Sequence, residues 1–67
     1  MEDIKLNIEA IRAQLKLTRS EMADRLSVSL DRYNRLASGE SKMLAVELVR
    51  LHEASGVPYE NIKIIGI

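Results

Sequence analysis

The sequence predicts an all-α fold, a small bundle of five helices followed by a short apolar C-terminal tail that could form a strand. Apolar residues recur at helical spacing nearly everywhere up to residue 55. Small polar residues suited to helix starts, and glycines suited to helix ends, divide the chain into short segments. Its 67 residues, 46% of them hydrophobic, are expected to make one small globular domain.

The first two helices are expected over residues 2–15 and from a cap at Thr18 to about Leu26. Thr18 and Glu21 have the spacing of a capping box, in which each side chain binds the backbone N–H of the other residue. Residues 27–29 read Ser-Val-Ser, a poor helical run that ends the second helix. In the first helix, apolar residues at i, i+4, i+7 and i+11 make one buried stripe: Ile4, Ile8, Ile11 and Leu15.

The third helix is expected to begin at Ser29, a suitable N-cap, and to stop at Gly39, which takes the left-handed conformation easily. Tyr33 and Leu36 lie at i, i+3 spacing and are expected to point inward. The outer face then carries Leu30, Asp31, Asn34, Arg35 and Ser38. This face is the one that suggests a function.

Ser41 is expected to cap a fourth helix over about residues 42–54, which Gly56 ends. Pro58 suits the first position of a short fifth helix through about Ile62. Residues 62–67 are β-branched and apolar and could pair as a strand. The expected core contacts of the fourth helix are Ala45, Leu48, Val49 and Leu51.

Composition excludes several classes of protein. The chain has no cysteine, which excludes a disulfide framework, a thiolate zinc site and a thiol nucleophile. Its apolar runs are far shorter than the ~20 residues of a membrane span, and its first residues do not resemble a signal peptide. We therefore expect a cytoplasmic protein without membrane contact. Tyr33 and Tyr59 are too few aromatic residues for a platform that stacks single-stranded bases.

Two very short helices that are joined by a three-residue turn and packed on a preceding helix describe a helix-turn-helix. We therefore divide the chain into a helix-turn-helix domain over residues 1–62 and an apolar tail over residues 63–67. The residues that define this pattern are Leu17-Thr18, Glu21-Met22-Ala23, Leu26, Val28-Ser29, Tyr33, Leu36, Gly39 and Gly56-Val57. In these residues the sequence resembles the Cro/repressor-type helix-turn-helix family of phage repressors and bacterial regulators, without gaps from about Ile8 to Ile62.

The resemblance implies a sequence-specific transcriptional regulator that binds double-stranded DNA, with a recognition helix over about residues 29–37 in the major groove. It implies phosphate or base contact at the start of the second helix, base-edge readout by the third helix, and backbone contacts from the loop after it. The implied DNA-binding residues are Thr18, Arg19, Ser29, Leu30, Asp31, Asn34, Arg35, Ser38 and Lys42, with Glu40 in the same loop.

Several positions depart from the family pattern. Ser27 stands where the family often has glycine in the turn, and Leu30 and Asp31 stand where it often has arginine or glutamine. Leucine can touch only a thymine methyl group, whereas aspartate can accept only from cytosine and repels phosphate.

A second departure concerns an ion pair of the family. The family often pairs an arginine of the first helix with a glutamate near the end of the third. Arg12 is present here, but Ala37 occupies the glutamate position. We expect Arg12 to pair with Glu40 or Glu47, or to stay solvated.

Charge is unevenly distributed along the chain. Ten basic and ten acidic residues give a formal net charge of zero. Residues 12–42 hold seven basic and four acidic side chains, a net charge of +3, while residues 1–11 and 43–67 carry −2 and −1. The weakly basic centre fits a DNA partner, although a domain that makes 6–10 phosphate contacts is usually more basic.

The alternative is a protein-interaction module on the same fold, which binds and modulates a repressor as an antirepressor does, with weak or no DNA binding. Leu30 is an apolar residue on the recognition face and could anchor such a partner. The isoleucine-rich tail could pair with a second copy, giving a homodimer, or with the partner. The expected dimer or partner contacts are Leu30, Ile62, Ile64, Ile65 and Ile67.

An enzyme is not expected. The sequence offers no Ser/His/Asp arrangement, no cluster of metal ligands and no glycine-rich phosphate loop. His52, the only histidine, is expected to lie at the edge of the core. We therefore expect no catalytic residue, cofactor, metal or small-molecule ligand.

Overall fold

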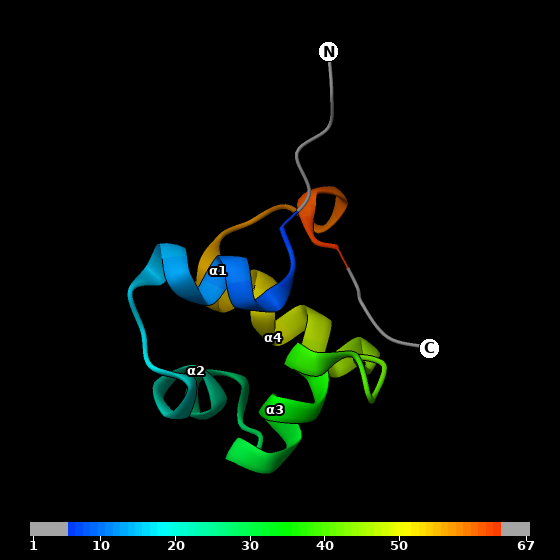
Figure 1. The fold of residues 1–67 in the computed structure, drawn as a ribbon. Coiled ribbons are helices and arrows are strands. Elements are labelled where there is room, and N and C mark those ends of the chain that lie inside the picture. The colour runs from blue at the N-terminus through cyan, green and yellow to red at the C-terminus, as the bar shows by residue number, and fades with distance from the viewer. Residues whose placement is uncertain (1–5, 64–67) are drawn as a thin grey trace.

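Four α-helices follow one another along residues 6–63, the part of the chain that the computed structural model describes (Figure 1). They are α1 (Ile8–Leu15), α2 (Arg19–Leu26), α3 (Leu30–Ser38) and α4 (Ala45–Ser55), and the 3-10 turn η1 (Tyr59–Asn61) follows them. α2 packs against α3 and α4, and α1 packs against the same two helices. The all-α class predicted from the sequence is confirmed.

The predicted fifth helix and C-terminal strand are wrong for the described residues. η1 is a single turn, and Pro58 precedes it as the cap instead of being its first residue. Ile62 forms an isolated parallel bridge with Leu6, whose N–H donates to the carbonyl of Asn61 at 2.7 Å. Within residues 6–63 this single bridge is the only β pairing, and Leu6 lies just before α1. Residues 64–67, the rest of the predicted strand, lie outside the described residues.

α1 begins at Ile8, later than the predicted start at residue 2. Leu6 is held in the bridge, and Asn7 is the N-cap, with its side-chain oxygen accepting from the N–H of Ala10 at 2.8 Å. The apolar stripe alone did not indicate this cap. Residues 2–5 of the predicted helix lie outside the described residues.

The predicted capping box of α2 is confirmed. The N–H of Glu21 donates to the hydroxyl oxygen of Thr18 at 3.1 Å, and the N–H of Thr18 donates to Glu21 Oε1 at 2.8 Å. α2 ends at Leu26, as predicted, and Ser27 follows in the left-handed conformation with φ of 58°. Such a backbone costs a non-glycine residue roughly 1–2 kcal/mol, so Ser27 forms the turn with some strain.

α3 also has its predicted limits. The hydroxyl of Ser29 accepts from the N–H of Arg32 at 3.0 Å, and Gly39, with φ of 86°, ends the helix. Tyr33 and Leu36 are buried, as their spacing predicted. The amphipathic pattern therefore placed the two faces of α3 correctly.

α4 begins at Ala45, three residues later than predicted, and Ser41 does not cap it. Leu44 is the N-cap, and the carboxylate of Glu47 accepts its N–H at 2.7 Å. The N–H of Ser41 instead donates to the carbonyl of Arg35 at 3.3 Å and so closes the end of α3. The segment between α3 and α4 is therefore a loop.

Two of the four core contacts predicted for α4 are wrong. Leu51 is buried and Leu48 packs half-buried against the core, but Val49 is 41% exposed and Ala45 is exposed. Glu47, only 3% exposed, lies on the inward face instead. At 100° per residue, positions 45 and 49 fall opposite position 47, which explains why both face outward.

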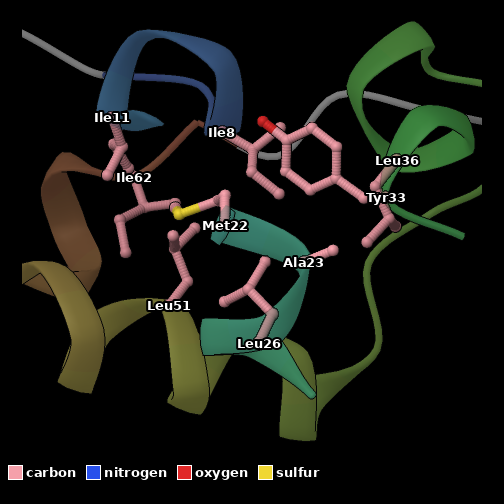
Figure 2. Packing of buried hydrophobic residues seen from close by; sticks show 9 residues of the cluster. All are labelled: Ile8, Ile11, Met22, Ala23, Leu26, Tyr33, Leu36, Leu51 and Ile62. Carbon is pink, nitrogen blue, oxygen red and sulfur yellow. The ribbon is translucent and has the colours of Figure 1, made fainter. Parts of the chain in front are cut away.

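Nine buried apolar side chains from all four helices and from the end of the described chain form one core (Figure 2). Burying one large aliphatic or aromatic side chain stabilises a fold by about 1.5–3 kcal/mol, so this cluster supplies most of the driving force. Within residues 6–63, no buried side-chain nitrogen or oxygen lacks a hydrogen-bond partner. The core residues are Ile8, Ile11, Met22, Ala23, Leu26, Tyr33, Leu36, Leu51 and Ile62.

Candidate nucleic-acid interface

α2 and α3 lie side by side (Figure 1). The turn between them consists of residues 27–29. On α3, the side that faces the core is closed by Tyr33 and Leu36, whose exposed fractions are 0% and 2%. Every residue predicted on the opposite side is exposed: Leu30, Asp31, Asn34, Arg35 and Ser38. We call these five residues the α3 outer face.

The start of α2 borders the α3 outer face. Thr18 and Arg19, both predicted DNA contacts, are exposed there. The Thr18 hydroxyl already accepts from the N–H of Glu21, and the carboxylate of Glu21 binds the N–H of Thr18. The hydrogen bonds from the Thr18 backbone and side chain lower the pKa of Glu21. A negative charge therefore lies at the start of α2, where the sequence predicts a DNA contact.

Arg19 connects three helices. Its Nη2 lies 2.9 Å from Glu9 Oε2 on α1, and its Nη1 donates to Asn34 Oδ1 on α3 at 3.3 Å. Its side chain remains 54% exposed. Arg19 is therefore held in place beside the α3 outer face without being withdrawn from the surface.

The carboxylate of Glu9 is the shared acceptor that links α1 to α2 and α3. Besides Arg19, it accepts from Arg12 Nε at 2.7 Å and from the hydroxyl of Tyr33 at 3.0 Å. Burial acts to raise the pKa of Glu9, but the hydrogen bonds from Arg12 and Tyr33 outweigh it, and the pKa is lowered. Glu9 is therefore a fixed anion between α1, α2 and α3.

The expected partners of Arg12, Glu40 or Glu47, are wrong. Arg12 pairs with Glu9 and donates to the carbonyl of Leu17 at 2.8 Å. Glu9 and Arg12 stand at i, i+3 on one helix, a spacing that commonly gives ion pairs. The sequence therefore contained the signal for this pair.

Arg35 and Asp31 form an ion pair on the α3 outer face. Arg35 Nη2 lies 2.8 Å from Asp31 Oδ2, at i, i+4 spacing, and the side chains are 55% and 74% exposed. Exposed pairs of this kind stabilise a helix by only about 0.3–0.5 kcal/mol. Arg35 can therefore leave Asp31 for a better acceptor at little cost.

The remaining predicted contacts lie at the two ends of α3. At the start, the Ser29 hydroxyl is used as the helix cap. At the end, the Ser38 hydroxyl donates to the carbonyl of Arg35 at 3.2 Å, and Glu40 and Lys42 are exposed in the loop that follows. The carbonyl of Lys42 accepts from Arg32 Nη2 at 3.3 Å, which ties this loop to α3.

The sequence did not reveal the ion pair that positions the loop. Arg32 Nε and Nη2 donate to the two oxygens of Glu47, each at 2.9 Å. The hydrogen bond from Arg32 lowers the pKa of Glu47, against burial, which acts to raise it. The two residues are fifteen positions apart on different helices, so no local spacing indicated the pair.

Besides Tyr59, which follows α4, large apolar residues of the described chain are exposed on α3 and at α4. Leu30 is 46% exposed on the α3 outer face. A second group of exposed apolar residues lies at the start of α4: Leu44, Val46 and Val49. The sequence did not single them out as exposed. Ile62, predicted to contact a second subunit or a partner, is only 7% exposed and packs in the core of its own chain. The other predicted tail contacts, Ile64, Ile65 and Ile67, lie outside the described residues.

The comparisons with known proteins found no matching protein-family model, curated protein or solved structure. Within residues 6–63, no helix is long and apolar enough to cross a membrane, and no group of three or more acidic, histidine or cysteine side chains is placed to hold a metal ion. His52 is half-buried, with Nδ1 lying 2.7 Å from the carbonyl of Val57 and its ring stacked on Tyr59.

Proposed function

We propose that the chain is a sequence-specific DNA-binding regulator of transcription, with α3 as its recognition helix. The observation that carries the proposal is the α3 outer face, where five residues able to contact DNA are exposed together beside the start of α2. A major groove about 12 Å wide admits one α-helix. The resemblance of the sequence to Cro/repressor-type regulators supports the same placement.

Each residue then has a role that suits its chemistry. Arg35 donates two hydrogen bonds to guanine, the commonest specific contact of arginine. Thr18, Arg19 and Lys42 contact phosphate groups on either side of the groove, where cations and polar side chains fix the orientation of a protein on DNA. Leu30 meets a thymine methyl group. The protein acts as a homodimer on paired half-sites or as a monomer with lower affinity.

The experiment is a selection of bound sequences from a pool of random double-stranded DNA, followed by affinity measurements across a salt series. We expect one enriched motif and an affinity that falls steeply with salt. Arg35→Ala should weaken binding to that motif by about 1–3 kcal/mol and relax its specificity at one position. Arg25→Ala, which removes an exposed arginine of α2, is the matched control and should leave the motif unchanged.

Absence of any enriched motif at low salt would overturn the proposal and favour the second candidate. That candidate is a protein-interaction module that binds and modulates a repressor. It is supported by the exposure of Leu30 at 46% and by the pairing of Arg35 with Asp31, which offsets the positive charge of the α3 outer face.

The second candidate has its own test. If a repressor is encoded beside this chain, the purified chain is mixed with it, and complex formation is measured by size-exclusion chromatography. Leu30→Asp should abolish the complex if the α3 outer face binds the repressor. Val46→Asp changes an equally exposed apolar residue on α4, 49% exposed, and should have no effect.

A further inference from the structure

Arg19 and Asn34 form one hydrogen-bonding unit on the proposed DNA-binding surface. Arg19 Nη1 and Asn34 Oδ1 are 3.3 Å apart, and both residues are exposed. A guanidinium group only donates hydrogen bonds, so the amide of Asn34 must turn its oxygen toward Arg19. Its nitrogen, with two N–H donors, is left for another partner.

The position of Arg19 is fixed from its other side. Glu9 Oε2 lies 2.9 Å from Arg19 Nη2, and Glu9 is itself bound by Arg12 and by the hydroxyl of Tyr33. One carboxylate is shared by two arginines, so this group keeps a net positive charge. The oxygen of Asn34 therefore lies beside a fixed cation.

Guanine and adenine differ at the atoms that such a unit would meet. An unconstrained asparagine reads adenine, because it donates to N7 and accepts from the N6 amino group. In Asn34 the accepting oxygen is bound to a cation, and a cation repels the partly positive amino group of adenine. Guanine presents two acceptors, N7 and O6, which suit a unit that offers donors and positive charge.

We propose that Asn34 is a specificity-determining residue that selects guanine over adenine, and that Arg19 is the residue that positions it. The inference rests on the proposed DNA-binding function. The guanine contact of Asn34 is in addition to that of Arg35. Asn34 lies about one helical turn along α3 from Asp31, the residue that pairs with Arg35.

The test is selection from random double-stranded DNA with the wild-type chain and with single variants. The base pair that Asn34 contacts is identified as the position of the selected motif at which Asn34→Ala no longer prefers one base. There we expect the wild-type chain to prefer guanine over adenine about tenfold, the discrimination typical of one good two-bond contact. Arg19→Ala should remove this preference, so that adenine is bound at least as well as guanine.

Three variants control for other effects of the substitution. Arg19→Lys keeps a cationic donor and should keep guanine. Arg25→Ala removes an arginine of the same helix and should change no base preference. Asn34→Asp leaves Arg19 bound to Glu9 but removes the amide donors, so the preference for guanine should be lost. This variant tests the inference even if Arg19→Ala does not fold. A purely structural role for Arg19 would weaken binding to all sequences without changing which base is preferred.

The free protein gives a measurement that needs no DNA. In an NMR spectrum, the side-chain N–H₂ resonances of Asn34 should shift in Arg19→Ala and not in Arg25→Ala. Unchanged resonances in Arg19→Ala, a wild-type preference for adenine, or guanine retained by Arg19→Ala would each overturn the inference while the proposed function stands. A pool with no enriched motif would overturn both.

Discussion

Arg32 on α3 holds the buried carboxylate of Glu47 on α4 with two hydrogen bonds of 2.9 Å. Glu47 also accepts the N–H of Leu44, so the pair sets where α4 begins relative to α3. We expect Glu47→Gln to lower the free energy of unfolding by about 1.5 kcal/mol, because the bonds from Arg32 lose their ionic acceptor. Urea denaturation measures the change.

Arg32→Met should cost more than Glu47→Gln. It leaves a carboxylate that is 3% exposed without its cation, whereas an arginine that has lost its partner can turn toward water. Glu53→Gln, which changes an exposed carboxylate of α4, is the control and should have little effect. If Arg32→Met proved as harmless as the control, the pair would not fix the two helices.

Stability should fall in acid. The pKa of Glu47 is lowered by its hydrogen bond from Arg32, and the pKa of Glu9 is lowered by Arg12 and Tyr33 against the effect of burial. A carboxyl whose pKa is lower in the folded chain stabilises the fold above its unfolded pKa, here 4.5, and this stability is lost as the pH falls through the folded pKa. Urea midpoints measured from neutral pH downward should decline below that value, and less steeply in Glu47→Gln.

Stability should also fall in strong alkali, for a different reason. Burial, with the adjacent Glu9, raises the pKa of Tyr33 from 10.0 to about 12. Because the folded pKa is the higher one, the stabilising effect is complete below pH 10.0 and is lost as the pH rises toward 12. Tyr33→Phe should remove this alkaline loss and should cost about 1 kcal/mol at neutral pH, through the missing bond to Glu9.

Thermal unfolding followed by circular dichroism at increasing pH would measure the alkaline effect. Tyr59→Phe is the matched control, because Tyr59 is 44% exposed and lies outside the core. An alkaline decline of the same size in Tyr33→Phe and in the wild-type chain would assign it to other groups.

Two substitutions at left-handed positions should have opposite effects. Ser27 has φ of 58°, so Ser27→Gly should raise the free energy of unfolding by up to about 1 kcal/mol, since the relief of strain exceeds the entropy cost of glycine. Gly56 has φ of 75°, and a Cβ atom added to it would meet no other atom within 4 Å. Gly56→Ala should therefore lower stability by about 1 kcal/mol through backbone strain alone. Changes of the same sign in the two variants would rule out this explanation.

Local signals allowed most of the fold to be predicted, and contacts between distant residues account for most of the errors. Thr18 and Ser29 mark helix starts through bonds that span three residues, and Gly39 marks a helix end through its own left-handed backbone, so a single sequence shows all three. The start of α4 depends on Glu47, whose orientation is set by an arginine fifteen residues earlier. Apolar residues occur on both sides of α4, and periodicity alone therefore wrongly placed Val49 inside.

For the candidate interface too, local patterns were predictable from the sequence and contacts between distant residues were not. The amphipathic pattern of α3 predicted which residues face outward, because Tyr33 and Leu36 define the buried side. It did not predict what those outward residues bind within the molecule. The contacts of Arg19 with Glu9 and Asn34 join residues that are ten or more positions apart, and they decide which donors and acceptors remain available.

Removing the negative charge of Asp31 should strengthen DNA binding if the proposed function is right. Asp31 lies 2.8 Å from Arg35 and, on the proposed surface, would repel phosphate. In Asp31→Asn the interface gains one unit of positive charge, so the slope of log affinity against log salt should steepen by about 0.9. The folded state should be affected by only a few tenths of a kcal/mol, since the pair is exposed. Glu53→Gln makes the same change of charge on α4 and should leave the slope unaltered. Weaker binding by Asp31→Asn would instead mean that Asp31 accepts a hydrogen bond from cytosine, and the motif selected by the variant would then lose that base pair.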